Sequence, residues 1–180
     1  MLFLFLSSNI FAQSQEDMQK WTAYMTPGDM HQMLAKANGT WNEELTMWES
    51  PDAPPQKMMA SCEMKMIMDG RYQEANHSGN FNNMPFQGHS IIGYDNIKKV
   101  FQSMWIDNMS TGITYMEGTY DPATKMVTLT GKMMNPMIGA EEDVKQTWQF
   151  VDDNTQLVQM FGMKDGKEMK TMEIKLTRKT

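Results

Sequence analysis

Cysteine is almost absent from this chain. Cys62 is the only cysteine among 180 residues, so no intramolecular disulfide can form in any compartment. A zinc knuckle built from paired cysteines is excluded for the same reason. The hydrophobic core must hold the fold unaided, and a chain of this length is enough for one such core but short for two. We therefore predict a single folded domain.

Positive charge is also scarce. The chain has 16 lysines and arginines against 22 aspartates and glutamates, which gives a formal net charge of −6. Nucleic-acid binding depends on clustered basic side chains that release counterions from phosphates. The charge balance therefore argues against a nucleic-acid partner.

Long apolar runs are missing apart from the first residues. Residues 1–12, MLFLFLSSNIFA, form an apolar run that ends in a small residue, which is typical of a secretory signal peptide. A membrane-spanning helix needs about 20 apolar residues, and no segment of this chain reaches that length. We expect an exported bacterial protein, periplasmic or secreted, with no membrane span. Residues 13–26 would follow as a linker or short amphipathic helix.

The common catalytic and cofactor motifs are absent as well. The sequence has no Gly-x-Ser-x-Gly, no P-loop and no Rossmann glycine series. His31, His77 and His89 do not have metal-ligand spacing. In acidic pairs such as Glu43–Glu44 the two members point to opposite faces of a strand, and we expect them at the surface. No cofactor is predicted, and a non-enzymatic role is favoured over an enzyme with a polar site inside the fold.

The pattern that is present is mostly β. Thr26-Pro27-Gly28-Asp29 predicts the start of a short helix, which Asn38-Gly39 would end. Beyond Gly39 the hydrophobic period is two and turn residues recur about every ten positions. The predicted strands are Thr40–Glu49, Lys57–Met68, Arg71–Ser78, Gln87–Tyr94, Lys98–Asp107, Gly112–Tyr120, Lys125–Met133, Asp143–Val151, Thr155–Met163 and Glu168–Leu176.

Strands joined by such short turns must pair with their sequence neighbours in antiparallel fashion. An open sheet of about ten strands would expose unpaired backbone at both edges, and closure into a barrel removes both. The predicted fold class is therefore all-β, a closed antiparallel barrel of about ten strands with a short N-terminal helix.

Short motifs along the strands carry a family likeness. They are Gly39-x-Trp41, Phe86-Gln-Gly88, Gly93-Tyr-Asp95-Asn96, Trp105-x-Asp107 and Gly118-x-Tyr120-Asp121. Together they resemble the DUF1579 family of uncharacterised, mostly bacterial proteins, over Pro27 to Arg178. The resemblance implies a calycin-like barrel, related to lipocalins, for residues 27–180, and it implies no activity.

Most of these motif residues have a structural interpretation. Trp41 would fill the closed end of the barrel, where a large ring occupies space that smaller side chains leave. Asp95 or Asn96 would hydrogen-bond nearby backbone in a turn. The alternative is that Asp95 and Asp107 form a carboxylate pair for acid–base chemistry.

Methionine is the compositional anomaly, with 23 residues. Cys62, Met64, Met66 and Met68 would lie on one face of a strand at intervals of about 6–7 Å. Thiolate and thioether ligands select soft ions, so this stripe predicts Cu(I) binding as an alternative function. Same-face side chains of one strand diverge, however, and methionine also serves as a flexible core filler. The filler interpretation is favoured.

The favoured function is binding of a small apolar or amphipathic molecule inside the barrel, which is the general use of barrels of this size. The alternation of side chains along the predicted strands, together with side-chain type, gives the residues expected near such a cavity. They are Trp105, Tyr115, Met126, Trp148, Phe150 and Phe161.

Overall fold

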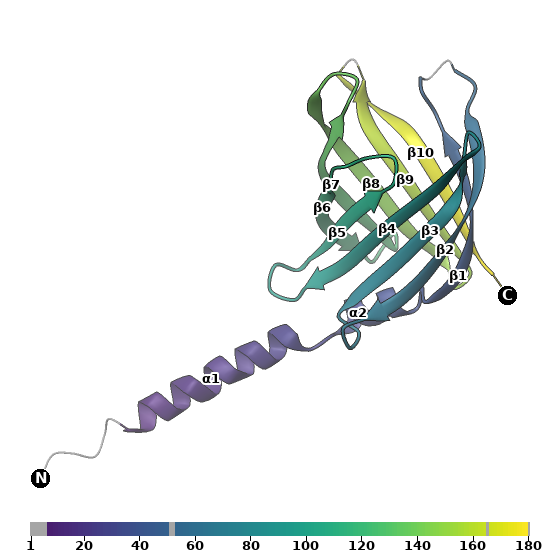
Figure 1. Ribbon diagram of the computed structural model, residues 1–180. Helices are drawn as coiled ribbons and strands as arrows, with labels where there is room; N and C mark the ends of the chain where they lie inside the picture. The colour runs from purple at the N-terminus through teal and green to yellow at the C-terminus, as the bar shows by residue number, and fades with distance from the viewer. Residues whose placement is uncertain (1–6, 51–52, 165, 180) are drawn as a thin grey trace, which may run out of the picture.

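The structure is a computed structural model that describes residues 7–50, 53–164 and 166–179. Those residues form two helices followed by ten strands in one barrel (Figure 1). The helices are α1 (Ser7–Met25) and α2 (Asp29–Ala35). The strands are β1 (Gly39–Met47), β2 (Gln56–Ile67), β3 (Tyr72–Phe81), β4 (Met84–Asp95), β5 (Val100–Asp107), β6 (Thr114–Asp121), β7 (Met126–Asn135), β8 (Ala140–Asp152), β9 (Thr155–Lys164) and β10 (Lys167–Arg178).

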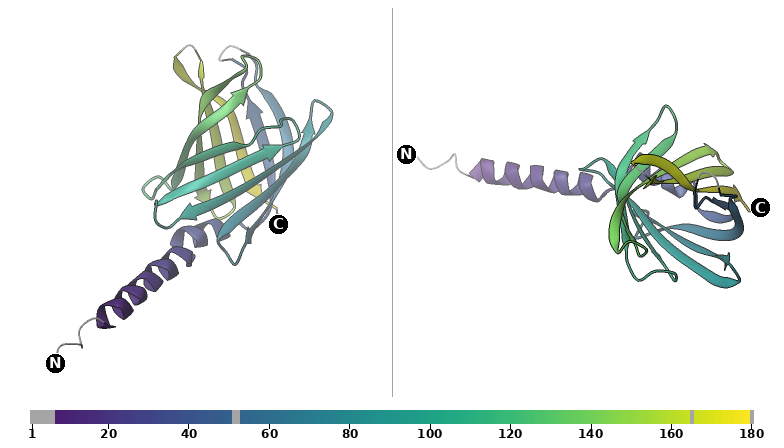
Figure 2. Two further views of the ribbon diagram at one scale, coloured as in Figure 1. Left: turned by 60° about the vertical axis from the view of Figure 1, so that its left-hand side comes forward. Right: turned by 90° about the horizontal axis from the view of Figure 1, so that it is seen from above.

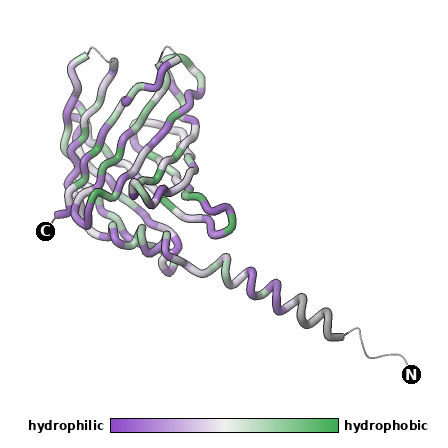
Figure 3. Tube along the Cα trace, turned by 180° about the vertical axis from the view of Figure 1, so that it is seen from behind, coloured by the Kyte–Doolittle hydropathy of each residue, from purple (hydrophilic) through white to green (hydrophobic). Residues whose placement is uncertain are grey.

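The strands close into an antiparallel barrel, which confirms the predicted fold class. Each strand pairs with its neighbour in sequence, and β1 completes the ring by pairing with β10 from Trp41 opposite Arg178 to Met47 opposite Met172. Hydrophobic and hydrophilic residues alternate along the strands (Figure 3). Alternate side chains therefore point into the barrel and out to solvent.

The β3–β4 hairpin is longer than predicted. The expected strands end at Ser78 and resume at Gln87, whereas β3 reaches Phe81 and β4 begins at Met84. Asn82 and Asn83 make the turn with φ values of 49° and 63°. Two consecutive left-handed residues are typical of the tight turn that matches strand twist, and asparagine tolerates this conformation.

Helix α2 lies across one end of the barrel and forms its floor (Figure 2). The Leu34 side chain is fully buried, and the Gln73 amide of β3 donates a 2.6 Å hydrogen bond to the Leu34 carbonyl. His31 is also buried, and its Nδ1 accepts a 3.0 Å hydrogen bond from the Gly28 backbone N–H. The helix is thereby fixed to the strands and capped at its start.

Helix α1 projects away from the barrel (Figures 1 and 2). The predicted linker or short helix at residues 13–26 is part of this longer helix. Residues 1–6 of the predicted signal peptide lie outside the described residues, and residues 7–12 belong to α1. The Asn96 amide donates to the carbonyls of Ala23, Tyr24 and Thr26, which anchors the end of α1 to the β4–β5 turn. Among the described residues no helix is both long and apolar enough to cross a membrane.

The packed core occupies the α2 end of the barrel. Inward side chains from β4 to β8 meet there under α2, and they are Ile92, Phe101, Met116, Val127, Leu129, Val144 and Trp148, together with Leu34 of the helix. A second cluster contains Trp41, which is 1% exposed and donates its indole N–H to the Ala37 carbonyl at 2.8 Å. The predicted role of Trp41 as a buried plug is confirmed.

Candidate functional site

A row of inward-facing residues crosses five neighbouring strands and begins in the second core cluster. The strand register places Trp41 opposite Cys62, Cys62 opposite His77, His77 opposite Gly88, and Gly88 opposite Asp107. Because directly paired residues share a face of the sheet, all five positions, Trp41 included, face the barrel interior. The row thus collects a thiol, an imidazole and a carboxylate from β2, β3 and β5.

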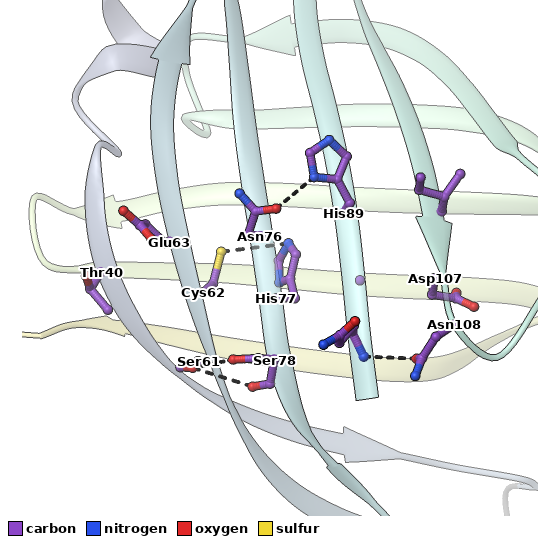
Figure 4. A pocket seen from close by; sticks show the side chains of 13 residues that line it. Thr40, Ser61, Cys62, Glu63, Asn76, His77, Ser78, His89, Asp107 and Asn108 are labelled. Carbon is purple, nitrogen blue, oxygen red and sulfur yellow. Dashed lines mark hydrogen bonds between the residues drawn. The ribbon is translucent and has the colours of Figure 1, made fainter. Parts of the chain in front are cut away.

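Glu43, one inward position further along β1 than Trp41, completes a hydrogen-bonded cluster. Its Oε1 lies 2.9 Å from His77 Nδ1. On the other side of the ring, His77 Nε2 lies 3.7 Å from Cys62 Sγ (Figure 4). Glu43 is 2% exposed and Cys62 is 1% exposed, whereas the His77 side chain keeps 13% of its surface exposed. We call Glu43, Cys62 and His77 the interior triad.

Small residues beside Glu43 allow its carboxylate to reach His77. The register places Ala60 opposite Glu43, and Gly79 opposite Ala60. Neither position carries a large inward side chain, so the glutamate can extend over them to the ring on β3. A bulkier side chain at either position would compete with the carboxylate for this space.

An aromatic wall flanks the interior triad. The Trp105 ring meets the His77 ring edge to face at 5.1 Å, and Phe86 stacks on Trp105 at 6.4 Å. The indole fills the space over Gly88, where an added Cβ would come within 2.4 Å of it. The Trp105 N–H donates a 2.7 Å hydrogen bond to Asp107, which explains the Trp-x-Asp motif.

Burial raises the pKa of the Cys62 thiol, and the Glu43 and Glu63 carboxylates raise it further. The thiol is therefore protonated at neutral pH and serves as the hydrogen-bond donor to His77 Nε2. The other ring nitrogen then carries the N–H that is donated to Glu43. The interior triad is thus a chain of two hydrogen bonds that ends on a buried carboxylate.

A second feature is a shallow groove of about 710 Å³ on the outside of the barrel across β1 to β5 (Figure 4). Most of its outward side chains are polar, and some of them are paired with one another. Ser61 and Ser78 lie 3.0 Å apart, and His89 Nδ1 lies 2.8 Å from the Asn76 amide oxygen. Cys62 and His77 also border this groove, but alternation directs their side chains inward, so they contribute main chain.

Inside the barrel the side chains above the floor are only partly buried. Leu129 and Val127, beside α2, have no exposed surface. The apolar inward residues toward the other end are less buried. Half-buried examples are Met47, Met58, Phe86, Trp105, Met160 and Met172. Since these side chains point toward the barrel axis, their exposed surface faces the barrel interior. We call this upper part of the interior the calyx.

The structure divides the six residues predicted to lie near a cavity. Trp105 faces the calyx, while Trp148 and Phe150 point inward, contact each other at 4.5 Å and belong to the core. Tyr115, Met126 and Phe161 alternate with the inward residues Met116, Val127 and Gly162 and lie on the outer face. The Phe161 ring lies 4.4 Å from the Lys145 ammonium. Whether any of them binds a ligand stays a prediction.

The Cys/Met stripe of β2 is also divided. Cys62 and Met64 are buried, Met66 packs against the core, and Met68 is 69% exposed in the turn after the strand.

Asp95 and Asp107 lie at opposite ends of the β4–β5 pair, since Asp95 faces Val100 at the start of β5. Asp95 accepts hydrogen bonds from Ile97 N and Lys98 N, which confirms its turn role.

Glu43 and His77 are the site residues that sequence reasoning missed. The acidic pair Glu43–Glu44 was expected at the surface, which is wrong for Glu43 and right for exposed Glu44. The alternation of side chains along a strand could have indicated the burial of Glu43. This residue lies two residues from both Trp41 and Leu45, which are apolar, so all three share the face that points to the core. The contact with His77 depends on strand register, which the sequence does not display.

The ten paired strands and the helix across one end make this a closed antiparallel β-barrel protein. Within that class the chain belongs to the DUF1579 family, described as proteins of unknown function, whose sequence profile matches residues 26–178. Among solved structures it is similar to Rv2717c from M. tuberculosis, at a TM-score of 0.61 and 10% identity over 86% of this chain and 100% of that one. At that identity the likeness concerns the fold alone. No curated protein matches the chain.

Proposed function

We propose that this chain is an exported bacterial binding protein whose calyx holds a small amphipathic molecule. The observation that carries the proposal is the partial burial of inward side chains above a fully packed floor. Side chains that point to the axis of a barrel and still reach solvent leave room for a guest. Burying their apolar surface would then favour binding by about 25 cal/mol per Å².

The apolar part of the guest would contact methionine and aromatic side chains. Several of the half-buried inward residues are methionines, among them Met47, Met58, Met160 and Met172. Methionine is flexible and polarizable, and it adapts to guests of differing shape. This composition favours an alkyl chain or another irregular apolar group over one rigid ring system.

The polar part of the guest is constrained by charge. Two inward side chains of the calyx walls are carboxylates, those of Asp107 and Glu142, and the buried carboxylate of Glu43 is hydrogen-bonded to His77, which reaches the calyx. Asp107 accepts from the Trp105 indole, and Glu142 accepts from the Asn135 amide at 2.7 Å. An anionic head group would meet like charge at low dielectric, which is costly. The calyx therefore favours a neutral or cationic amphiphile over a fatty acid.

Three ten-carbon amphiphiles test this proposal directly. Decylamine, decanol and decanoate share one alkyl chain and differ in head-group charge, and displacement of the neutral dye Nile red reports their binding. We expect decylamine and decanol to displace the dye and decanoate to bind at least tenfold more weakly. Equal or tighter binding of decanoate would contradict the charge argument, and no dye binding at all would contradict the calyx.

Two methionines of β9 supply a matched pair of variants. Met160 points into the calyx opposite Met172, and Met163 lies on the outer face with 49% of its surface exposed. Met160→Lys should weaken decanol binding at least tenfold, because a charge replaces apolar contact surface. Met163→Lys should leave decanol binding unchanged. Equal effects of the two substitutions would place the guest elsewhere.

Export rests on the apolar N-terminal run. If residues 1–12 are a signal peptide, the protein recovered from the periplasm or medium of a bacterial host begins at Gln13. Intact-mass measurement of the recovered chain checks this start. Export would be contradicted if the protein were found only in the cytoplasm, as the full-length chain.

A further inference from the structure

The interior triad also has the composition of a metal site. Within the part of the chain that the structure describes, Glu43, Cys62 and His77 are the one group of three such side chains whose ligand atoms all lie within 4.8 Å of one another. They come from three adjacent strands, so their side chains converge. The Cys62–Met68 stripe of β2, by contrast, spreads along a single strand.

We propose that Cys62 Sγ and His77 Nε2 bind a zinc ion and that Glu43 positions the histidine. The two ligand atoms lie 3.7 Å apart. Tetrahedral zinc, with bonds of about 2.3 Å to sulfur and about 2.0 Å to nitrogen, holds such atoms about 3.5 Å apart. The ion takes the place of the thiol proton between sulfur and nitrogen, and its two other positions are left to water or to a donor group of a guest.

Glu43 acts on the opposite side of the histidine ring. Its carboxylate holds Nδ1–H at 2.9 Å, which leaves the Nε2 lone pair directed at the thiol. A carboxylate–histidine–zinc arrangement of this kind fixes the ring and raises its basicity as a ligand. Glu43 is therefore a positioning residue and does not touch the ion.

Charge balance favours a divalent ion. Binding converts Cys–SH and Zn²⁺ into Cys–S–Zn⁺ and one released proton. The loaded site then holds one thiolate and one carboxylate, both almost fully buried, against two positive charges. Monovalent copper would leave one negative charge uncompensated in the same place, and buried net charge is costly.

The interior triad is well placed to keep such an ion. Cys62 and Glu43 are closed off by the core on one side, and His77 is the member that reaches the calyx. The Trp105 ring covers the histidine from β5 at 5.1 Å. An aromatic wall of this kind lowers the local dielectric, which strengthens the attraction between the ion and its anionic partners.

Cobalt titration of the full chain, purified and stripped with a chelator, tests the site. Co²⁺ bound to a thiolate gives a near-ultraviolet charge-transfer band, so we expect this band to saturate at one ion per chain and to disappear when Zn²⁺ is added. Cys62→Ser and His77→Gln should abolish the band. Glu43→Gln should weaken binding by about 10–100-fold without abolishing it.

Two controls separate this site from other candidates. His89→Gln, in the outer groove, and Met68→Leu, at the exposed end of the stripe, should leave the titration unchanged. The proposal is overturned if the folded wild-type chain shows no thiolate band at millimolar cobalt, or if the band survives His77→Gln. The wild-type titration decides the question even if a variant fails to fold. Displacement of Nile red by decanol does not depend on the ion, so the two proposals fail separately.

Discussion

At the scale of single residues, the site depends on polar groups that the barrel buries and pairs. Glu43 is held by His77, Cys62 by His77, and Trp105 by Asp107. Buried polar groups of this kind cost free energy unless each has a partner. Changing one member therefore alters its neighbours as well.

Cys62 should make the folded state sensitive to alkaline pH. Burial raises the pKa of this thiol in the folded chain, so its contribution to stability is present below the ordinary thiol pKa of about 8.5 and is lost as pH rises above it. The free energy of unfolding of metal-free protein should fall by up to about 1.4 kcal/mol per pH unit in that range. Urea denaturation at a series of pH values measures this slope, which Cys62→Val should remove. Parallel curves for the two proteins would contradict it.

Gly88 should tolerate no side chain because the Trp105 ring covers it. An added Cβ would lie 2.4 Å from the ring, so Gly88→Ala must displace the indole from His77 and Asp107. We expect a loss of about 1–3 kcal/mol in the free energy of unfolding, as for other overpacked cores. Gly112→Ala is the matched control, since nothing lies within 4 Å of a Cβ there. Equal stability of the two variants, measured by urea denaturation, would argue against the wall.

At the scale of secondary-structure elements, the strands and their order in the barrel were predictable, and the register between paired strands was not. The period-two alternation of hydrophobic and polar residues beyond Gly39 located all ten strands. An antiparallel strand with one face in solvent and one in the core shows this alternation in its own sequence. The extra length of β3 and β4 was missed because Asn82-Asn83 is a weaker turn signal than Asp-Gly. Register is a property of two strands together, which is why the meeting of Glu43, His77 and Cys62 required the structure.

Helix α2 should loosen in acid. Burial lowers the pKa of His31, and protonation would remove the Nδ1 lone pair that accepts the Gly28 N–H. Because the folded-state pKa is depressed, the contribution of His31 to stability is present above the ordinary value of about 6.5 and is lost as pH falls below it. Protection factors of α2 amides should decline between pH 7 and 5 relative to strand amides. Hydrogen exchange of the wild type and His31→Gln measures this, and an unchanged α2 in the wild type would refute it.

At the scale of the whole molecule, barrel closure and the floor are joined by one side chain. Arg178, in the last strand, donates to the carbonyls of Lys36 and Asn38 after α2, each at 2.7 Å, and lies 4.3 Å over the Trp41 ring. The last strand is thus fixed to the segment between α2 and β1, where β1 meets β10. A closed end of this kind leaves the opposite end of the barrel as the entrance to the calyx.

Arg178→Ala should therefore weaken the entire fold and not only its last strand. We expect the free energy of unfolding to fall by about 1–3 kcal/mol, because three charged hydrogen bonds are lost, those to the main-chain carbonyls of Lys36, Asn38 and Asp153. Lys175→Ala, at an exposed position of the same strand, should change it by less than about 0.5 kcal/mol. Thermal denaturation of both variants gives the comparison, and equal losses would show that the arginine contacts are not stabilising.

The central claim is that a guest binds inside the calyx, and methionine methyl spectra test it most directly. In protein labelled with ¹³C at methionine methyls, titration with decanol should shift the signals of the inward residues Met47, Met58, Met160 and Met172. The outward and exposed Met59, Met134 and Met163 should not move. Shifts confined to the outward set, or no shift in the inward set at saturating decanol, would contradict the claim.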